Sequence, residues 1–220
     1  MSRNIVKRLF MYFTGLFVMT IGIAVSVKSN LGVSPVSSIP YTITCIWGIE
    51  MGKATILFHC FLVLLQIILL RKKYKLKNLL QIIVGIVFGY FTTFCNWGVS
   101  FLPDPQNILI RIGMLLISTL FIAFGIFLYL PPDIMPLAGE GAMQAVSDVS
   151  GIAFPKVKIG FDVSMVTVSL ITCLIFIRSL GSVGIGTIIA AVLVGMELGY
   201  ITKCFGELRD KWLKSNESYT

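Results

Sequence analysis

Six long apolar segments dominate this sequence and identify the lipid bilayer as its solvent. Each segment has close to the ~20 residues needed to cross the hydrocarbon core. They are Leu9–Val27, Ala54–Leu70, Leu79–Phe101, Ile108–Leu130, Ile159–Ile177 and Ile185–Thr202. Only 13% of the residues are charged, whereas a soluble domain usually carries about 25%. We therefore expect an all-α membrane protein with six transmembrane helices.

Two further segments, Ser34–Gly48 and Pro136–Gly151, are too short or too polar to be plain spans. In the first, Ser34 suits the N-cap of a helix and Pro35 suits its first turn. In the second, Pro136 and Gly139 break the chain, and a short helix is expected from about Gly141 to Ser150. Both segments are predicted to be re-entrant or interfacial rather than full crossings.

The basic residues predict an orientation, since lysine and arginine accumulate on the cytoplasmic side. Six crossings place four basic groups on one side, with both termini cytoplasmic. The groups are Arg3, Lys7 and Arg8; Arg71, Lys72, Lys73, Lys75 and Lys77; Lys156 and Lys158; and Lys203, Arg209, Lys211 and Lys214. Anionic lipid explains the net charge of +8, and no nucleic-acid partner is expected.

An internal repeat is indicated by matching fragments in the two halves. VGIVFGYFT at Val84–Thr92 resembles VGMELGYIT at Val194–Thr202, and Gly22 corresponds to Gly125 at an offset of 103 residues. The predicted organisation is a first membrane repeat (1–101), an external link (102–107), a second repeat (108–205) and a cytoplasmic polar tail (206–220). Three crossings per repeat invert the second copy, as in many secondary transporters.

Ionisable side chains at membrane depth are costly and usually face a partner or a cavity. Here they are His59, Asp162, Glu197 and, in the second short segment, Glu140. Each also has a purely structural interpretation: an interfacial histidine, an ion pair with Lys158, a hydrogen bond within the bundle, and a capping acid. The complete set of candidate substrate-binding residues is Ser34, Ser37, His59, Gly139, Glu140, Gly141, Asp162, Thr187 and Glu197.

Several chemistries are disfavoured by the residues that the chain offers. GSVGIGT at Gly181–Thr187 has no P-loop lysine and no preceding strand, so no nucleotide site is expected. The five cysteines form no CxxC pair, so neither a metal site nor a disulfide is expected. With one histidine, no HExxH and no GxSxG, we expect neither an enzyme nor a cofactor.

Four fragments together resemble the YczE/YyaS/YitT family of bacterial multi-pass integral membrane proteins, and the YczE-like branch in particular. They are LGVSP at Leu31–Pro35, PLAGEG at Pro136–Gly141, KIGFD at Lys158–Asp162 and GIGT at Gly184–Thr187. The resemblance implies a protein of the bacterial inner (plasma) membrane with suspected transport activity. It supplies no substrate.

Two functions are compatible with these features. The first is a small secondary transporter or permease that moves a small polar or anionic solute by alternating access. The second is a substrate-binding or regulatory membrane subunit that partners another protein. The candidate partners are therefore the lipid bilayer, a small-molecule solute, and either a second copy of the chain or a companion membrane protein.

Overall fold

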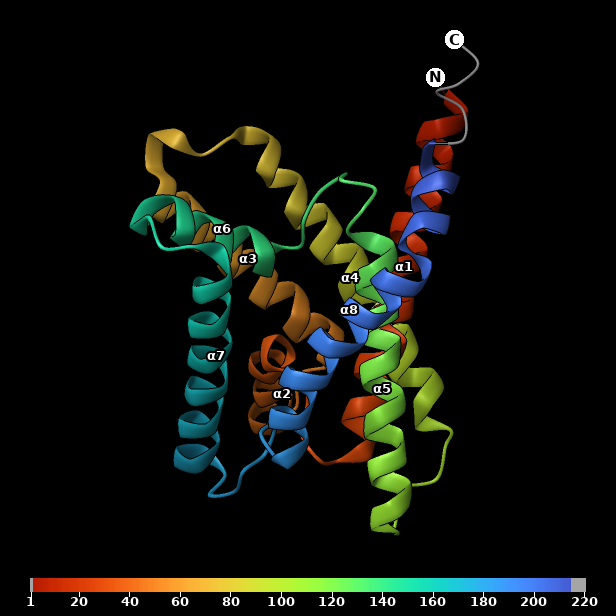
Figure 1. The fold of residues 1–220 in the computed structure, drawn as a ribbon. Helices are drawn as coiled ribbons and strands as arrows, with labels where there is room; N and C mark the ends of the chain where they lie inside the picture. The colour runs from red at the N-terminus through yellow and green to blue at the C-terminus, as the bar shows by residue number, and fades with distance from the viewer. Residues whose placement is uncertain (1, 215–220) are drawn as a thin grey trace.

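The computed structural model describes residues 2–214, all of whose regular elements are helices (Figure 1). The longer helices are α1 (Ser2–Ser29), α3 (Met51–Leu70), α4 (Leu80–Ser100), α5 (Ile108–Tyr129), α7 (Phe154–Phe176) and α8 (Ile185–Lys214). Two short helices, α2 (Pro35–Trp47) and α6 (Ala138–Ser150), lie between them. Two 3₁₀ turns, η1 (Arg71–Lys73) and η2 (Leu76–Leu79), join α3 to α4.

The prediction of six spans is confirmed by length and hydropathy. Six stretches are long and apolar enough to cross a membrane: Ile5–Ser29, Met51–Lys73, Leu76–Ser100, Ile108–Tyr129, Phe154–Phe176 and Ile185–Leu213. The two short helices are not among them, as expected. The chain is thus an all-helical protein with six candidate membrane-spanning helices.

The two short helices have similar boundaries because similar residues begin and end them. Ser34 occupies the N-cap of α2 and a proline lies in its first turn, as predicted. Both helices end on a left-handed glycine, Gly48 after α2 and Gly151 after α6. Helix α6 begins at Ala138, three residues before the expected start. Leu137 is its N-cap, and the Leu137 carbonyl accepts the first-turn hydrogen bond from Gly141 N at 3.0 Å.

Helices α1 and α5 cross in close contact at the centre of the molecule because small residues lie at the crossing. A Cβ added to Gly15 would lie 2.8 Å from Gly125 O, and one added to Gly22 would lie 2.7 Å from Ser118 O. Small residues at a helix crossing let two backbones approach within van der Waals contact, which drives association where lipid offers no hydrophobic effect. The α1–α5 pair is therefore the structural centre of the bundle.

Two GxxxG spacings, Gly85–Gly89 and Gly195–Gly199, are of the kind that forms helix-packing faces, and only the first is covered by a neighbouring helix. Gly85 and Gly89 of α4 receive α3, with His59 against Gly85 and Ile56 against Gly89. A Cβ added to Gly195 or Gly199 of α8 would meet no atom of the described residues within 4 Å. The physical reason is that α8 packs against α5, whereas α7 packs against α2 and α6. Helices α7 and α8 are therefore separated, whereas α3 and α4 are in contact.

Helix α8 continues well into the segment expected to be a polar tail. It remains helical to Lys214, and Arg209 lies over the Phe127 ring with 4.5 Å between its guanidinium carbon and the ring centroid. Near the other end of the chain, Lys7 lies 5.5 Å from the Trp212 ring centroid. Residues 206–214 thus belong to the folded bundle, and the rest of the expected tail lies outside the described residues.

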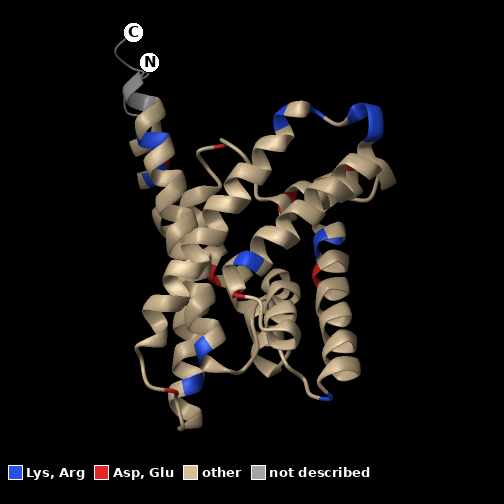
Figure 2. Ribbon diagram, turned by 180° about the vertical axis from the view of Figure 1, so that it is seen from behind, with Lys and Arg blue, Asp and Glu red and all other residues tan. Residues whose placement is uncertain are grey.

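The basic side chains are distributed unevenly along the bundle. Figure 2 shows most of the lysines and arginines toward the end where α1 begins and α8 ends, with a smaller group at the opposite end. At that opposite end Arg111 donates to Ser29 O at 2.8 Å and also contacts Asn30 O, so it satisfies carbonyls at the end of α1. Lys28 pairs there with Asp104 at 2.6 Å.

Candidate functional site

The two short helices begin next to each other inside the protein. The Cβ position of Gly139, in the first turn of α6, lies 3.6 Å from Val36 Cγ1, in the first turn of α2. Val36 packs against the buried cluster that contains Ala138 and Ala142 of α6 and Phe58 of α3. From this meeting point α6 runs along α3, and α2 runs along α7 (Figure 1). Both positive helix ends are consequently brought to one interior region.

Serine hydroxyls surround the start of α2. Ser34 does not cap the helix with its side chain; its Oγ donates to Ser37 Oγ at 3.1 Å. Ser38 donates to Pro35 O at 2.6 Å and accepts from Ser169 of α7 at 2.9 Å. Ser37 and Ser38 are both buried. The first turn of α2 therefore combines a helix N-terminus with hydroxyl groups, a combination suited to a polar or anionic group.

Two buried glutamines hold the start of α6. Gln66 of α3 donates to Gln81 Oε1 of α4 at 2.8 Å and to Ala138 O at 3.2 Å. A Cβ added to Gly141 would lie 2.6 Å from Gln81 Nε2. Gly141 thus allows α6 to rest directly on the two amides. Gln66 and Gln81 are absent from the predicted site, although each is a polar residue within an apolar stretch, a signal that a search limited to ionisable residues overlooks.

Glu140 lies in the first turn of α6, and groups of α5 and α7 act on its carboxyl. Its Oε2 is buried and has no hydrogen-bond partner among the described residues. Burial raises the pKa of Glu140, and the Tyr129 hydroxyl and the Lys158 charge act in the opposite direction. Tyr12, whose hydroxyl donates to Met135 O at 2.7 Å, lies beside Tyr129 with 6.0 Å between their ring centroids. Glu140 as a whole is partly exposed, and a carboxyl with one buried oxygen beside two phenols and an amine is the most unusual electrostatic feature of this region.

Lys158 and Asp162 form the ion pair that their spacing on α7 predicts. Lys158 Nζ lies 2.8 Å from Asp162 Oδ2. The second oxygen, Asp162 Oδ1, is buried and finds no partner within residues 2–214. Both residues act on the Glu140 carboxyl through their charges. The structure therefore brings Asp162 and Glu140 into one electrostatic group.

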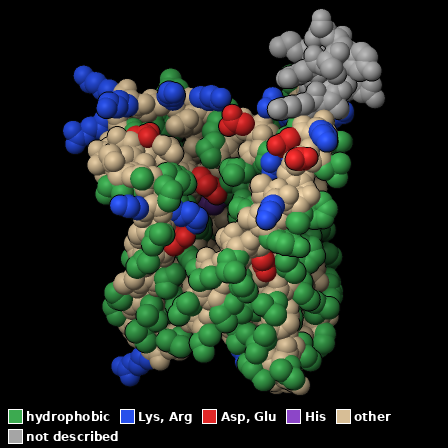
Figure 3. Space-filling model, viewed as in Figure 1, with side chains coloured by type: hydrophobic (Ala, Val, Ile, Leu, Met, Phe, Trp, Pro, Cys, Tyr) green, Lys and Arg blue, Asp and Glu red, His purple; other side chains and the backbone are tan. Residues whose placement is uncertain are grey.

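His59 is almost completely buried, with 4% of its surface exposed. Its ring stacks on Phe88 of α4 with 5.6 Å between the centroids and rests on the Cα of Gly85. His59 Nδ1 has no hydrogen-bond partner in the described part of the chain. Figure 3 shows the surface hollowed between α7 and α8, with acidic and basic side chains and the single histidine in the hollow. Glu140 is itself partly exposed, so its region is not sealed from the outside.

Thr187 lies in a different place, where the loop before α8 closes onto the loop before α2. Gly186 N donates to Leu31 O at 2.8 Å, and Val33 N donates to Ser182 O at 3.3 Å. Gly184 N donates to Thr187 Oγ1 at 3.2 Å, and a Cβ added to Gly184 would overlap Leu31 O. GSVGIGT is therefore a backbone seal between the two halves of the chain.

Glu197 is held by α5 rather than by the groups around Glu140. Its Oε1 accepts a hydrogen bond from Thr119 Oγ1 at 3.0 Å. Its Oε2 is buried without a partner in the described region. The structure thus gathers Ser34, Ser37, Gly139, Glu140 and Gly141 around the start of the two short helices, with Asp162 adjacent. Thr187 and Glu197 lie apart from this group.

The sequence matches the family of unknown function DUF6198 over residues 6–203. The chain belongs to this family. It is also similar to the uncharacterized membrane protein YczE of Bacillus subtilis (strain 168), with 23% identity over 202 residues, 91% of this chain and 87% of that protein. The expected resemblance to YczE is confirmed. No solved structure matches the chain.

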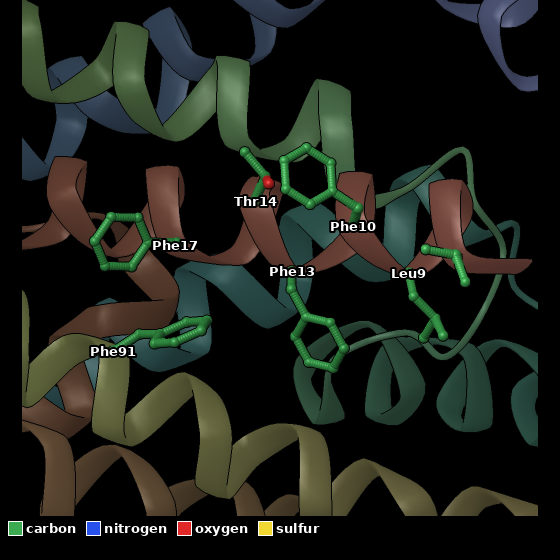
Figure 4. A pocket seen from close by; sticks show the side chains of 7 residues that line it. Leu9, Phe10, Phe13, Thr14, Phe17 and Phe91 are labelled. Carbon is green, nitrogen blue, oxygen red and sulfur yellow. The ribbon is translucent and has the colours of Figure 1, made fainter. Parts of the chain in front are cut away.

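A separate groove on this DUF6198 family member runs between α1 and α4 (Figure 4). It has a volume of about 520 Å³ and is lined by Val6, Leu9, Phe10, Phe13, Thr14, Phe17 and Phe91. The lining is almost entirely apolar and comes from two candidate spans. The groove therefore offers a surface for lipid chains rather than a site for polar chemistry.

Proposed function

We propose that the protein is a small secondary transporter that moves a small polar or anionic solute by alternating access. The observation that carries the proposal is the meeting of α2 and α6 at Val36 and Gly139, beside the unpartnered carboxyl of Glu140. Half-helices that end inside the membrane are typical of transporters, which use their N-termini to bind anionic groups. The serines at the start of α2 add hydroxyl donors to the same place.

The proposal includes an inverted repeat, which backbone conformation supports. Two non-glycine residues with positive φ, Asn30 (51°) and Asp133 (49°), lie 103 positions apart. The helix-ending glycines Gly48 (65°) and Gly151 (71°) have the same offset. The crossing of α1 and α5 follows it too. Gly15 contacts Gly125, and Gly22 contacts Ser118. The same offset relates Gly15 to Ser118 and Gly22 to Gly125, so each contact is the repeat equivalent of the other.

The helix pairs support the same arrangement. In the first half α1 packs on α4, and in the second α5 packs on α8; α6 lies on α3 as α2 lies on α7. One helix pair differs between the two halves: α3 packs tightly on α4, whereas the corresponding helices α7 and α8 are separated. In alternating access, two similar halves adopt different arrangements at a given moment and then exchange them. The separation of α7 from α8 fits one such state.

A sealed end and a hollowed face also fit a single state of this cycle. The seal is the backbone contact of Leu31 with Gly184 and Gly186. The positive-inside rule makes the basic-rich end cytoplasmic, so the seal would be on the external side. The proposed state is therefore closed to the exterior, with the solute site reached through the hollow between α7 and α8.

A cross-linking flux assay tests the proposal. The offset of 103 residues relates Ile56 to Ile159 of α7, and the matching fragments at Val84–Thr92 and Val194–Thr202 relate Gly89 to Gly199 of α8. Ile159 is therefore expected opposite Gly199 in the alternative arrangement, as Ile56 lies against Gly89 here. The protein carries Ile159→Cys and Gly199→Cys, with its five native cysteines replaced, and is reconstituted into liposomes. The liposomes are loaded with a mixture of labelled small carboxylates, amino acids and phosphate. We expect faster loss of at least one solute than from protein-free liposomes, arrest on oxidation, and recovery on reduction.

The single variant Ile159→Cys is the matched control and should keep its flux under oxidation. Transport that continues unchanged in the oxidised, fully cross-linked double variant would exclude this motion. Equal leakage from protein-free and protein-containing liposomes, together with a companion membrane protein that co-purifies in stoichiometric amount, would favour the role of a membrane subunit instead.

A further inference from the structure

We propose that Glu140 is a proton-binding site and that Lys158 exchanges between Asp162 and Glu140 as the proton leaves. The inference rests on the proposed function, because it names the coupling ion of that same site. It would make solute movement depend on the proton gradient.

The first observation is a pair of unsatisfied polar atoms beside one another. Glu140 Oε2 and Tyr129 Oη are both buried, and neither makes a hydrogen bond of normal geometry among residues 2–214, although the Tyr129 hydroxyl is close enough to act on the carboxyl. Tyr129 has 1% of its surface exposed. An ionised carboxylate left unpaired in such a place would be strongly unfavourable, whereas a neutral carboxylic acid costs much less and can donate a hydrogen bond. The arrangement thus favours a protonated Glu140 in this state.

The second observation is the position of the nearest cation. Lys158 is engaged with Asp162 Oδ2 at 2.8 Å rather than with Glu140. About half of the Lys158 side-chain surface is exposed (52%), so it has room to move. A lysine has several rotatable bonds and three donors, and it can change partners with a small displacement of its helix. Helix α7, which carries Lys158, is separated from α8 and is therefore the element with space to shift.

The surrounding charges favour a proton over a metal cation. The titratable and charged groups that act on Glu140 are Tyr129 of α5 and Lys158 and Asp162 of α7, and Glu140 in turn acts on Tyr12 of α1. Helix α3 adds His59 at the hollow, and the amides of Gln66 and Gln81 lie under α6. The described residues contain no group of three His, Cys, Asp or Glu side chains suited to a metal. The Lys158 ammonium also repels a second cation.

The exchange balances without any further reactant. The Glu140 carboxylic acid gives its proton to water and becomes a carboxylate. The Lys158 ammonium leaves Asp162 and pairs with the new carboxylate, so the group gains one negative charge and the unpaired carboxylate becomes Asp162. About a fifth of the Asp162 side-chain surface is exposed (20%), so water can reach this charge. Protonation of Glu140 returns Lys158 to Asp162. The position of α7 and the proton occupancy of Glu140 are thereby linked.

Infrared titration of the purified protein in lipid nanodiscs tests the proposal without any solute. The absorption of a protonated carboxylic acid is followed as pH rises. We expect a band that titrates above the ordinary glutamic acid value of about 4.3. It should be absent in Glu140→Gln and unchanged in His59→Gln. In Asp162→Asn it should titrate at lower pH, because Lys158 is then free to pair with Glu140 and a like charge is removed. In Lys158→Met the midpoint should rise by about one pH unit or more, since an opposite charge has been removed. Lys158→Arg should stay close to the wild type.

The titration is run on a Glu197→Gln background, because Glu197 also has a buried carboxyl oxygen without a partner in the described region. On that background, a band that survives in Glu140→Gln, or a titration at the ordinary value with Glu140 present, would overturn the proposal. The Lys158 variants keep the test decisive if Glu140→Gln fails to fold, because they change a half-exposed side chain. An unchanged midpoint in Lys158→Met would exclude the exchange. Since the titration uses no solute, it separates the proton site from the transport proposal. If the proton site is confirmed but no flux is found, the proton-site proposal stands and the transport proposal is refuted.

Discussion

Gly15 and Gly125 face each other at the crossing of α1 and α5 so closely that a Cβ on either glycine would lie 2.8 Å from the other's carbonyl oxygen. The next contact along the crossing, Gly22 with Ser118, is equally close. No side chain can be inserted there without separating the two helices. Because α1 and α5 also carry α4 and α8, their distance affects the whole bundle.

Gly15→Ala should therefore destabilise the protein by about 1–3 kcal/mol, the usual cost of overpacking a close contact. Gly113→Ala on α5 is the matched control, since a Cβ there meets no described atom within 4 Å. It should leave stability unchanged or raise it slightly, because alanine favours helix. Thermal unfolding of both variants in the same detergent measures the difference. Equal midpoints for the two variants would contradict the close crossing.

The amide pair under α6 should behave as a unit. Gln66→Leu removes the donor to both Gln81 and Ala138 O, and an unsatisfied buried group costs about 1–3 kcal/mol. In Gln66→Leu/Gln81→Leu the loss should be smaller than the sum of the single losses, since neither amide is left without its partner. Denaturant unfolding of the four proteins gives the coupling energy. Gln144→Ala, at an exposed position on α6, should have little effect.

Stability should fall with rising pH in the range just above the ordinary glutamate pKa. Burial raises the pKa of Glu140, so the folded protein holds this proton more tightly than the unfolded chain does. That contribution is complete below the ordinary value and disappears as pH rises through the raised one. Glu140→Gln should lose this part of the pH dependence, whereas Glu207→Gln, exposed on α8, should keep it. Thermal unfolding midpoints across the pH range provide the measurement.

The seal at Leu31 can be opened by one methyl group. Gly184→Ala places a Cβ against Leu31 O and should weaken the closed contact by about 1–3 kcal/mol, roughly 5- to 150-fold in population. Cys173, fully buried beside Ser182, reports the opening. In a protein with Cys173 as its only cysteine, a water-soluble maleimide should react faster in Gly184→Ala. Gly195→Ala, where a Cβ meets no described atom within 4 Å, should react at the wild-type rate.

The spans and the two short helices could be predicted because their signals are local. A run of apolar residues longer than the hydrocarbon core, or a serine and proline before a short apolar stretch, determines structure within a few residues of itself. The ion pair of Lys158 with Asp162 was predictable for the same reason. The surroundings of Glu140 were not, because Tyr12 and Tyr129 reach it from two other helices. Nothing near Glu140 in the sequence identifies them.

The contrast between the two GxxxG faces could not be read from the sequence either. Gly85–Gly89 and Gly195–Gly199 have the same spacing and similar neighbours. One face is covered by α3, and the other meets no described atom within 4 Å. The same spacing therefore occurs in two different packings, and the local sequence does not indicate which packing each face adopts. The difference depends on where α7 lies, and that is a property of the whole bundle.

The short helices exchange sides, with α2 lying along α7 and α6 along α3. Each half of the chain thus buries its short helix in the other half. A chain cut between α4 and α5 would yield two fragments. One would lack α6 from the surface of α3 and the other would lack α2 from the surface of α7, so neither would be a domain on its own. The two halves of the chain are therefore interlocked through these two short helices. Any hinge motion must change the contacts of α2 and α6, because no boundary between the two halves of the sequence is free of them.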